Sequence, residues 1–517
     1  MKRHNVLASF ALATSLLLNG CSAAAPAAPI AGAPSYAAEA AMEAPAADYY
    51  PSAPADMFFE NYGVRGFVTA AKDSLSTFAV DVDTGSYTVA RNYVQDGWLP
   101  PEDAVRAEEF VNYFDYRYPN PDESDTFAIH VDGAPFPFAD RSSNRMMRVG
   151  IQGYSVPADQ RQDVALTFVI DVSGSMDMEN RLGLAKRALY MLVDELRPTD
   201  SVAIIVYGTN ARIILDMTPV SEKQTILSAI NRLVAEGSTN AAAGLWLGYR
   251  LASEHFNPEV INRVVLLSDG VANVGITGPD DLLDVIQEHA AEGITLTTVG
   301  LGMGNYNDTL MEQLADDGDG FYAYVDSMKE AQRIFVDELT SSLLTIAKDA
   351  KIQVEFNPEV VERYRLVGYE NRDVADDDFR NDEVDAGEVG AGHSVTALYE
   401  LEMLPGVEDP AARVATVHLR WQEIGSGEVI EMERPFPLGE FSASFEESAP
   451  RFQLAVAVAE YAELLKHSPF AWEGSLHELS TQVSQIDALI AEREGAQDED
   501  VKELAQLIWL ADGLQAQ

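Results

Sequence analysis

Between residues 161 and 345, short apolar stretches alternate with segments in which apolar residues recur every three or four positions. The first pattern predicts buried β-strands and the second predicts amphipathic helices. The predicted strands are 163–171, 201–208, 211–217, 262–270, 293–302 and 320–326. The predicted helices are 182–196, 221–234, 241–255, 279–291, 306–315 and 327–345. This alternation predicts an α/β domain: a doubly wound, mainly parallel six-stranded sheet with helices on both faces and the short strand 211–217 at an edge.

The segments on either side of this domain have other patterns. Residues 57–160 combine strand-like alternation with helical spacing, including a helix expected to begin at Pro101, and predict a flanking α+β domain. Residues 346–445 read mainly as strands, with an acidic loop at 373–392, and 446–517 read as a helical segment. We expect a sandwich-like β-rich domain that takes strands from 57–160, with the α/β domain inserted into it.

The N-terminus has the pattern of a targeting segment. A basic start and a short apolar stretch predict a signal peptide over residues 1–20. The sequence "LNGC" ends at Cys21 and resembles the lipobox of bacterial lipoproteins, which implies a lipidated cysteine and a membrane anchor. Residues 21–56 then form an Ala- and Pro-rich tether, expected to be disordered. Ser22 resembles the sorting pattern for the outer membrane, facing the periplasm or the exterior; an ordinary secreted protein with a chance cysteine remains the alternative.

The amino-acid composition limits which kinds of molecule this chain is expected to bind. The 517 residues include 35 Lys and Arg against 83 Asp and Glu, for a formal net charge of −48. A chain this acidic is not expected to bind nucleic acid, because binding phosphates needs a basic face. It attracts cations and basic groups instead. Cys21 is the only cysteine, which excludes intrachain disulfides and cysteine nucleophiles in the folded body.

Oxygen-bearing side chains lie in three separate segments, two at predicted strand ends and one in the turn before a predicted helix. Asp171, Ser173 and Ser175 come where the first strand of the domain stops, Thr239 lies in a Gly-Ser-Thr-Asn turn before a helix, and Asp269 ends the strand 262–270. Ligands of open α/β sheets bind outside the carboxyl ends of the strands, near the point where strand order reverses. Carboxylates and hydroxyls suit a hard divalent cation such as Mg²⁺, Ca²⁺ or Mn²⁺. Helix capping explains any one of the three pieces, but not all three together.

The set Asp-x-Ser-x-Ser, a later Thr and a later Asp-Gly resembles the metal-ion-dependent adhesion site (MIDAS) of von Willebrand factor type A (VWA) domains. The resemblance implies that Asp171, Ser173, Ser175, Thr239 and Asp269 form the shell of a divalent cation, with Mg²⁺ favoured. It also implies that the hydroxyls bind directly or through water, that the carboxylates often act through water, and that an Asp or Glu of a protein partner fills an open position.

The resemblance extends beyond this domain. The stretches "TFAVDVDTGSYTVARNYVQDG" before it and "LLTIAKDAKIQVEFNP" after it are similar to those of bacterial envelope proteins of the YfbK type. The similarity covers nearly all of residues 60–515. It implies an N-terminal flanking domain, a central VWA domain and a C-terminal domain of unknown function.

Three functions remain open on the sequence. The first is a lipid-anchored binding module that uses its cation to hold an acidic group of another protein. The second is a structural envelope protein with a stabilising metal. The third is a metal-dependent hydrolase or a chelatase-type accessory subunit, but no catalytic residue is expected, because the sequence nominates no general base and contains no G-x-S-x-G or phosphate-loop pattern. Residues 315–326 resemble a calcium loop, but Ala315 occupies the first ligand position, so an ordinary turn is predicted. For Asp177, two residues after Ser175, a helix-start acid is favoured over a role in the metal shell.

Overall fold

The computed structural model describes residues 57–515, except for 81–82, 123, 140–142, 158, 271–278, 303–306, 339–342, 383 and 385. The predicted signal peptide, the tether and Cys21 lie outside the described residues. No helix in the described part of the chain is long and apolar enough to cross a membrane.

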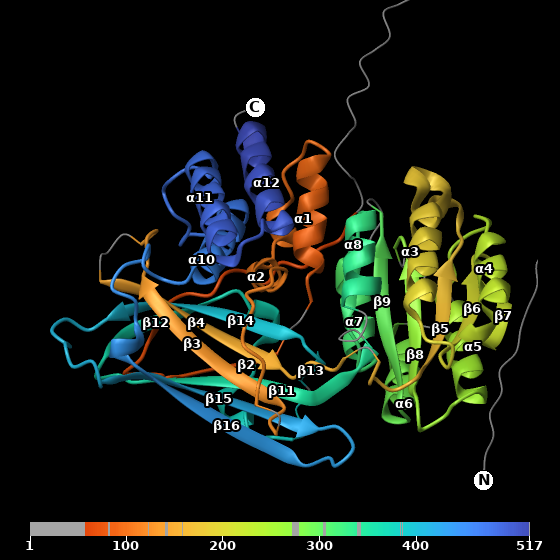
Figure 1. Cartoon of the computed structure of the whole chain (residues 1–517), viewed down its shortest axis with the longest axis horizontal. Helices are drawn as coiled ribbons and strands as arrows, with labels where there is room; N and C mark the ends of the chain where they lie inside the picture. The colour runs from red at the N-terminus through yellow and green to blue at the C-terminus, as the bar shows by residue number, and fades with distance from the viewer. Residues whose placement is uncertain are drawn as a thin grey trace, which may run out of the picture. The chain divides into compact units, whose positions relative to one another are not determined.

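A six-stranded sheet forms the centre of the α/β domain, with the strand order β10-β9-β8-β5-β6-β7 (Figure 1). Its strands are β5 (Val164–Asp171), β6 (Ser201–Tyr207), β7 (Ala211–Pro219), β8 (Ile261–Ser268), β9 (Ile294–Leu301) and β10 (Tyr322–Val325). All neighbours pair in parallel except β7, which pairs antiparallel with β6 at the edge. The mainly parallel sheet and its edge strand are as predicted. Because β6 and β8 flank β5, the strand order reverses at β5.

Helices cover both faces of this sheet. They are α3 (Arg181–Glu195), α4 (Lys223–Asn231), α5 (Ala241–Glu254), α6 (Pro279–Ala291), α7 (Asp308–Asp316) and α8 (Met328–Gln332). Side chains of α3 and α4 share a core with one face of β5, through Phe168 and Ile170. Side chains of α5, α6 and α7 share a core with the other face, through Val169. Every residue of β5 is therefore buried, which explains its unbroken apolar pattern.

A β-sandwich surrounds this domain in the sequence. One sheet has the order β1-β12-β14-β4-β3, and the other has the order β13-β11-β15-β16 with β2 paired to β11. The strands are β1 (Val68–Thr69), β2 (Leu75–Ala79), β3 (Phe127–Pro135), β4 (Asn144–Gly153), β11 (Thr345–Phe356), β12 (Val361–Val367), β13 (Gly387–Gly390), β14 (Ser394–Met403), β15 (Arg413–Glu423) and β16 (Val429–Pro437). Both sheets contribute to one apolar core. Segments 57–160 and 346–445 thus share their sheets and are not two separate folding units.

Outside the α/β domain, the described part of the chain contains five further helices. They are α1 (Gly85–Gln95), α2 (Ala107–Asn112), α10 (Pro450–Leu465), α11 (Leu476–Glu494) and α12 (Glu499–Gln515). The five helices form one apolar core that also includes Met146 of β4 and Leu398 of β14. In Figure 1 they lie together over the sheet that contains β4 and β14.

Three sequence predictions differ from the structure. The helix expected from Pro101 is split into a 3₁₀ turn (Glu102–Ala104) and α2, because Val105 and Arg106 are extended. The acidic segment 373–392, predicted as a loop, contributes β13 to a sheet. Within the range 327–345 predicted as one helix, the described residues form α8 and a π-helical turn (Arg333–Asp337), residues 339–342 lie outside the described residues, and β11 already begins at Thr345.

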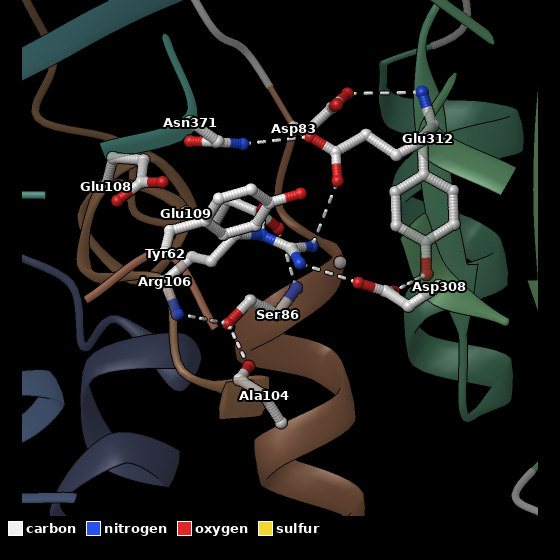
Figure 2. A network of polar contacts seen from close by, with 12 residues as sticks. Tyr62, Asp83, Ser86, Ala104, Arg106, Glu108, Glu109, Asp308, Glu312 and Asn371 are labelled. Atoms are coloured by element: carbon white, nitrogen blue, oxygen red, sulfur yellow. Dashed lines mark hydrogen bonds and ion pairs between the residues drawn. The ribbon is translucent and has the colours of Figure 1, made fainter. Parts of the chain in front are cut away.

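A buried cluster of charged groups joins the α/β domain to the segment that precedes it (Figure 2). Arg106 lies at its centre and forms ion pairs with Glu109 of α2 and Asp308 of α7, the latter at 2.6 Å. The hydroxyl of Tyr322 on β10 also donates to Asp308, at 2.6 Å. The backbone N–H of Arg106 also donates to the hydroxyl of Ser86, at 2.8 Å, whereas an unbroken helix would direct it to a backbone carbonyl.

Candidate metal site

Asp171 is the last residue of β5, and its side chain is fully buried. The backbone N–H of Ser173 donates to its Oδ1 at 2.7 Å, and the hydroxyl of Ser268 donates to its Oδ2 at 3.2 Å. Burial raises the pKa of Asp171 to about 6; the hydrogen bonds from Ser173 oppose this rise, and the charge of Asp269 adds to it. Asp171 is thus a constrained carboxyl group at the point where the strand order reverses.

Ser173 and Ser175 hold their hydroxyls together beside Asp171. Gly174 begins a 3₁₀ segment, η2 (Gly174–Asn180), which places the two Oγ atoms 2.9 Å apart. Adjacent oxygens of an octahedral Mg²⁺ shell with bonds of 2.0–2.1 Å also lie about 2.9 Å apart. The two hydroxyls therefore fit neighbouring positions on one small divalent cation.

The loop that carries Thr239 is hydrogen-bonded to this turn through its backbone. The N–H of Gly174 donates to the carbonyl of Gly237 at 3.2 Å, and the N–H of Glu236 donates to the carbonyl of Val172. Gly237 has a φ of +78°, a conformation that glycine adopts readily and that lets the loop turn here. Thr239 is half-buried two residues later, directly before Asn240, the N-cap of α5.

Asp269 follows β8 directly and is almost fully buried. Its Oδ2 accepts a hydrogen bond of 2.9 Å from Nη1 of Arg181, the first residue of α3. Asp269 also lies near enough to Asp171 for its charge to raise the pKa of that group. The ends of β5 and β8 and the loop between α4 and α5 that carries Thr239 therefore meet at the carboxyl ends of the parallel strands, and their role in binding a metal stays a prediction.

Three neighbours of these residues were not expected from the sequence. Ser268 donates to Asp171, Arg181 pairs with Asp269, and Tyr207, at the end of β6, is fully buried with its pKa raised by burial and by the charge of Asp171. Ser268 precedes Asp269 in the sequence, so its place at the strand end could have been noticed. Nothing local in the sequence pairs Arg181 with Asp269, because 88 positions separate them in the chain.

The calcium-like segment 315–326 runs from the end of α7 through a turn into β10, and three of its acids have partners in other segments. Asp319 forms an ion pair with Lys348, Asp317 accepts a hydrogen bond from Gln287, and Asp326 forms an ion pair with Arg91 at 2.7 Å. Asp177 is exposed in the first turn of η2. In the described ranges, no three His, Cys, Asp or Glu side chains come together as a metal cluster. The five predicted metal ligands do not form such a cluster, because three of them carry hydroxyl groups and only Asp171 and Asp269 are acids.

Comparison with known families assigns most of the chain. Residues 165–337 match the von Willebrand factor type A domain, and residues 341–514 match the domain described as "Uncharacterized protein YfbK, C-terminal". Residues 53–148 match a model described as "von Willebrand factor". VWA domains typically mediate protein–protein interactions, often through a MIDAS.

Individual proteins give the same picture. The chain is 36% identical over 468 residues to the "Uncharacterized protein YfbK" of Escherichia coli K12, covering 86% of this chain and 79% of that one. It is 26% identical over 305 residues to the "Uncharacterized protein sll0103" of Synechocystis, covering 57% and 70% of the two chains. Among solved structures, a von Willebrand factor type A protein from Catenulispora acidiphila covers 73% of this chain and 88% of its own, with 17% identity and a TM-score of 0.42. The chain belongs to the YfbK family of VWA-domain proteins.

Proposed function

We propose that this chain is a cell-envelope lipoprotein whose VWA domain binds a divalent cation and uses it to hold a carboxylate of a protein partner. The cation shell comprises Asp171, Ser173, Ser175, Thr239 and Asp269, and Mg²⁺ is the favoured ion. The observation that carries the proposal is the 2.9 Å separation of the Ser173 and Ser175 hydroxyls beside the buried carboxylate of Asp171. This arrangement supports the proposal because it presents hard oxygen donors from one tight turn to one point.

The donor set explains how an acidic protein can hold an acidic partner. Three of the proposed ligands are neutral hydroxyls, and one of the two carboxylates, Asp269, already pairs with Arg181. A divalent cation bound there keeps a local positive charge, although the whole chain has a formal charge of −48. The cation supplies one strong electrostatic contact to an incoming carboxylate.

Removing the carboxylate of Asp171 tests the cation site. We expect millimolar Mg²⁺ to raise the melting temperature of the native chain by several degrees, since an ion that binds only the folded state stabilises it. Asp171→Ala should lose this rise, whereas Asp177→Ala, which removes an exposed carboxylate of the same turn, should keep it. Differential scanning calorimetry with Mg²⁺ or EDTA measures both. An equal response of the native chain and Asp171→Ala would rule out the site.

Partner binding is tested by crosslinking in membranes that contain the native chain or Asp171→Ala. A partner that depends on the cation should be recovered with the native chain in Mg²⁺, but not in EDTA and not with the variant. Equal recovery in all three conditions would refute cation-mediated binding. A strong rise in melting temperature with no partner would favour the structural role instead.

The anchor is a separate part of the proposal and rests on the "LNGC" sequence alone. Cys21→Ser should prevent lipidation and release the protein from the membrane fraction, as measured by mass spectrometry of the mature N-terminus and by fractionation of outer and inner membranes. An unmodified Cys21 in the native protein would contradict this part and leave the cation site untouched.

A further inference from the structure

Arg181 places a positive charge beside the proposed cation site, in addition to the charge of the ion itself. Its Nη1 lies 2.9 Å from Oδ2 of Asp269, and both side chains are only 4% exposed. We propose, building on the cation site described above, that Arg181 is an internal counter-charge that lowers the affinity of this site for divalent ions. The guanidinium group compensates Asp269 when the ion is absent and repels the ion when it binds.

The position of Arg181 is fixed by the segments around it. It is the first residue of α3 and directly follows η2, the turn that carries Ser175. Its side chain passes over Gly302, just after β9, where any Cβ atom would collide with it. Gly302 also has a φ of +79°, so two features disfavour a larger residue there. The missing side chain of Gly302 thus leaves the space through which the Arg181 side chain reaches Asp269.

Burial makes this pair energetically important. A carboxylate with almost no access to water needs a compensating charge, and a buried pair that loses one partner leaves the other uncompensated. Asp171 and Asp269 contribute two formal negative charges to the proposed shell, and Arg181 cancels one of them. The shell therefore attracts a divalent ion less strongly than its five ligands alone would.

An opposite effect has to be weighed. The hydrogen bond from Arg181 also orients Asp269, and a well-oriented ligand strengthens metal binding. A cation within a few ångströms of a divalent ion in a poorly solvated site acts more strongly than the orientation supplied by one hydrogen bond. Repulsion should therefore dominate, and removing the positive charge should tighten metal binding.

The same domain offers a matched control. Arg161 and Asp200 form another buried pair, 2.6 Å apart and 2% and 0% exposed. Asp200 also accepts the N–H of Val164, the first residue of β5. This pair therefore lies at the amino end of β5, opposite to Asp171 at its carboxyl end. Arg161→Gln removes the nearer arginine from Asp200, which also lies 3.8 Å from Arg197, in a pair of similar burial far from the proposed ion.

The experiment compares the native full chain with Arg181→Gln, Arg181→Lys and Arg161→Gln, using calorimetric titration with Mg²⁺ and Mn²⁺ and melting temperatures in EDTA. We expect Arg181→Gln to bind Mg²⁺ about tenfold more tightly than the native chain. Arg181→Lys keeps the charge and should stay within about threefold of the native Kd. Arg161→Gln should lower the melting temperature in EDTA but leave the Kd for Mg²⁺ unchanged.

The possible results separate the inference from the function on which it rests. An unchanged or weaker affinity in Arg181→Gln would overturn the inference while the cation site stands. If Arg181→Gln does not fold, Arg181→Met, which is also neutral, takes its place: binding about tenfold tighter than native would support the inference, and an unchanged or weaker affinity would overturn it. If neither the native chain nor any variant binds Mg²⁺ or Mn²⁺, the cation site itself fails, and the inference fails with it.

Discussion

Asp171 and Glu460 are both buried carboxyl groups, and burial raises the pKa of each. They differ in what surrounds them. Asp171 lies at a sheet edge beside hydroxyls that can share a cation, whereas Glu460 of α10 lies in a helical core and accepts the N–H of Trp472 at 2.6 Å. The neighbours of a buried acid therefore distinguish a candidate ligand from a group that is held neutral for packing.

Glu460 should make the stability of the chain depend on pH. Burial raises its pKa from 4.5 to about 8; Glu463 and Glu400 add to this rise, while the N–H of Trp472 and Arg365 oppose it. Because the folded pKa lies above the unfolded one, the stabilisation is complete below pH 4.5 and is lost as pH rises through 8. The loss reaches at most about 5 kcal/mol well above pH 8.

Glu460→Gln should remove most of this loss, since a glutamine is neutral and its carbonyl can still accept the N–H of Trp472. Melting temperatures measured between pH 6 and 9 test this, with Glu492→Gln, an exposed position on α11, as the control. A native chain with the same slope as Glu460→Gln would contradict the assignment.

Individual site residues could be predicted where the signal is local. The motif that contains Asp171, Ser173 and Ser175 is readable because a strand and a tight turn place its members together within five residues. Arg181 could not be assigned in the same way, since its partner Asp269 is distant in the sequence and only the folded sheet brings them together. Side-chain pairing across distant segments depends on tertiary structure, which a single sequence does not display.

At the scale of elements, α5 is packed unusually closely against the sheet. A Cβ atom at Gly248 would lie 2.5 Å from Cγ2 of Val169 on β5, and one at Gly244 would lie 2.7 Å from the ring of Tyr207 on β6. Small residues on this face let the helix lie close to the two strands that carry Asp171 and Tyr207. The position of α5 also determines where Asn240, its N-cap, and the adjacent Thr239 lie.

Gly248→Ala should therefore destabilise the chain. Alanine favours a helix by about 1 kcal/mol over glycine, but overpacking a close contact costs about 1–3 kcal/mol, so a net loss is expected. Gly513→Ala on α12, where no atom lies within 4 Å of the new Cβ, should be neutral or slightly stabilising. Thermal unfolding of both variants provides the comparison, and equal stabilisation by both would show that α5 can move away from β5.

The helices and strands were predicted best in the α/β domain, where helices cover both faces of the sheet. The α/β alternation from β5 to β10 follows directly from apolar periodicity, because each strand except the edge strand β7 is covered on both sides. The helix expected at Pro101 is split at the extended residues Val105 and Arg106, and the N–H of Arg106 bonds to the distant Ser86, a tertiary contact that local spacing does not reveal. The acidic segment that contains β13 was predicted as a loop because it is rich in Asp, Glu and Gly. The short strand β13 forms by pairing with β11, which the composition does not indicate.

For the whole molecule, buried ion pairs of Arg106 and of Arg91 connect the VWA domain to the helices before it. Arg106→Met should destabilise the chain by about 3–5 kcal/mol, because it leaves Glu109 and Asp308 buried without their shared cation. Arg250→Met, which removes an exposed pair with Glu254, should change stability by less than about 1 kcal/mol. Chemical denaturation, followed by limited proteolysis near α7, distinguishes them, and a small effect of Arg106→Met would mean that water enters and solvates the cluster.

The domain composition of the chain was largely readable from the sequence, but the sharing of strands was readable only in outline. Mixed strand and helix signals indicated that 57–160 contributes to the β-rich body. Which strand pairs with which depends on long-range packing: β4 lies between β3 and β14, and β1 pairs with β12. Alternating apolar residues identify a strand and its buried face, but they do not determine which strand pairs with it.

The pairing of β4 with β14 has a consequence during synthesis. Gln152 of β4 reaches Gly392, next to β14, across 240 residues of chain, and the VWA domain is made in between. Until translation delivers the later strand, the edge of β4 has its backbone N–H and C=O groups unpaired, a state prone to aggregation. Early folding of the VWA domain would shorten the path between the two strands and reduce the time for which that edge is exposed. This nascent chain should therefore depend on a chaperone that shields β-edges more than a chain with sequential strands does.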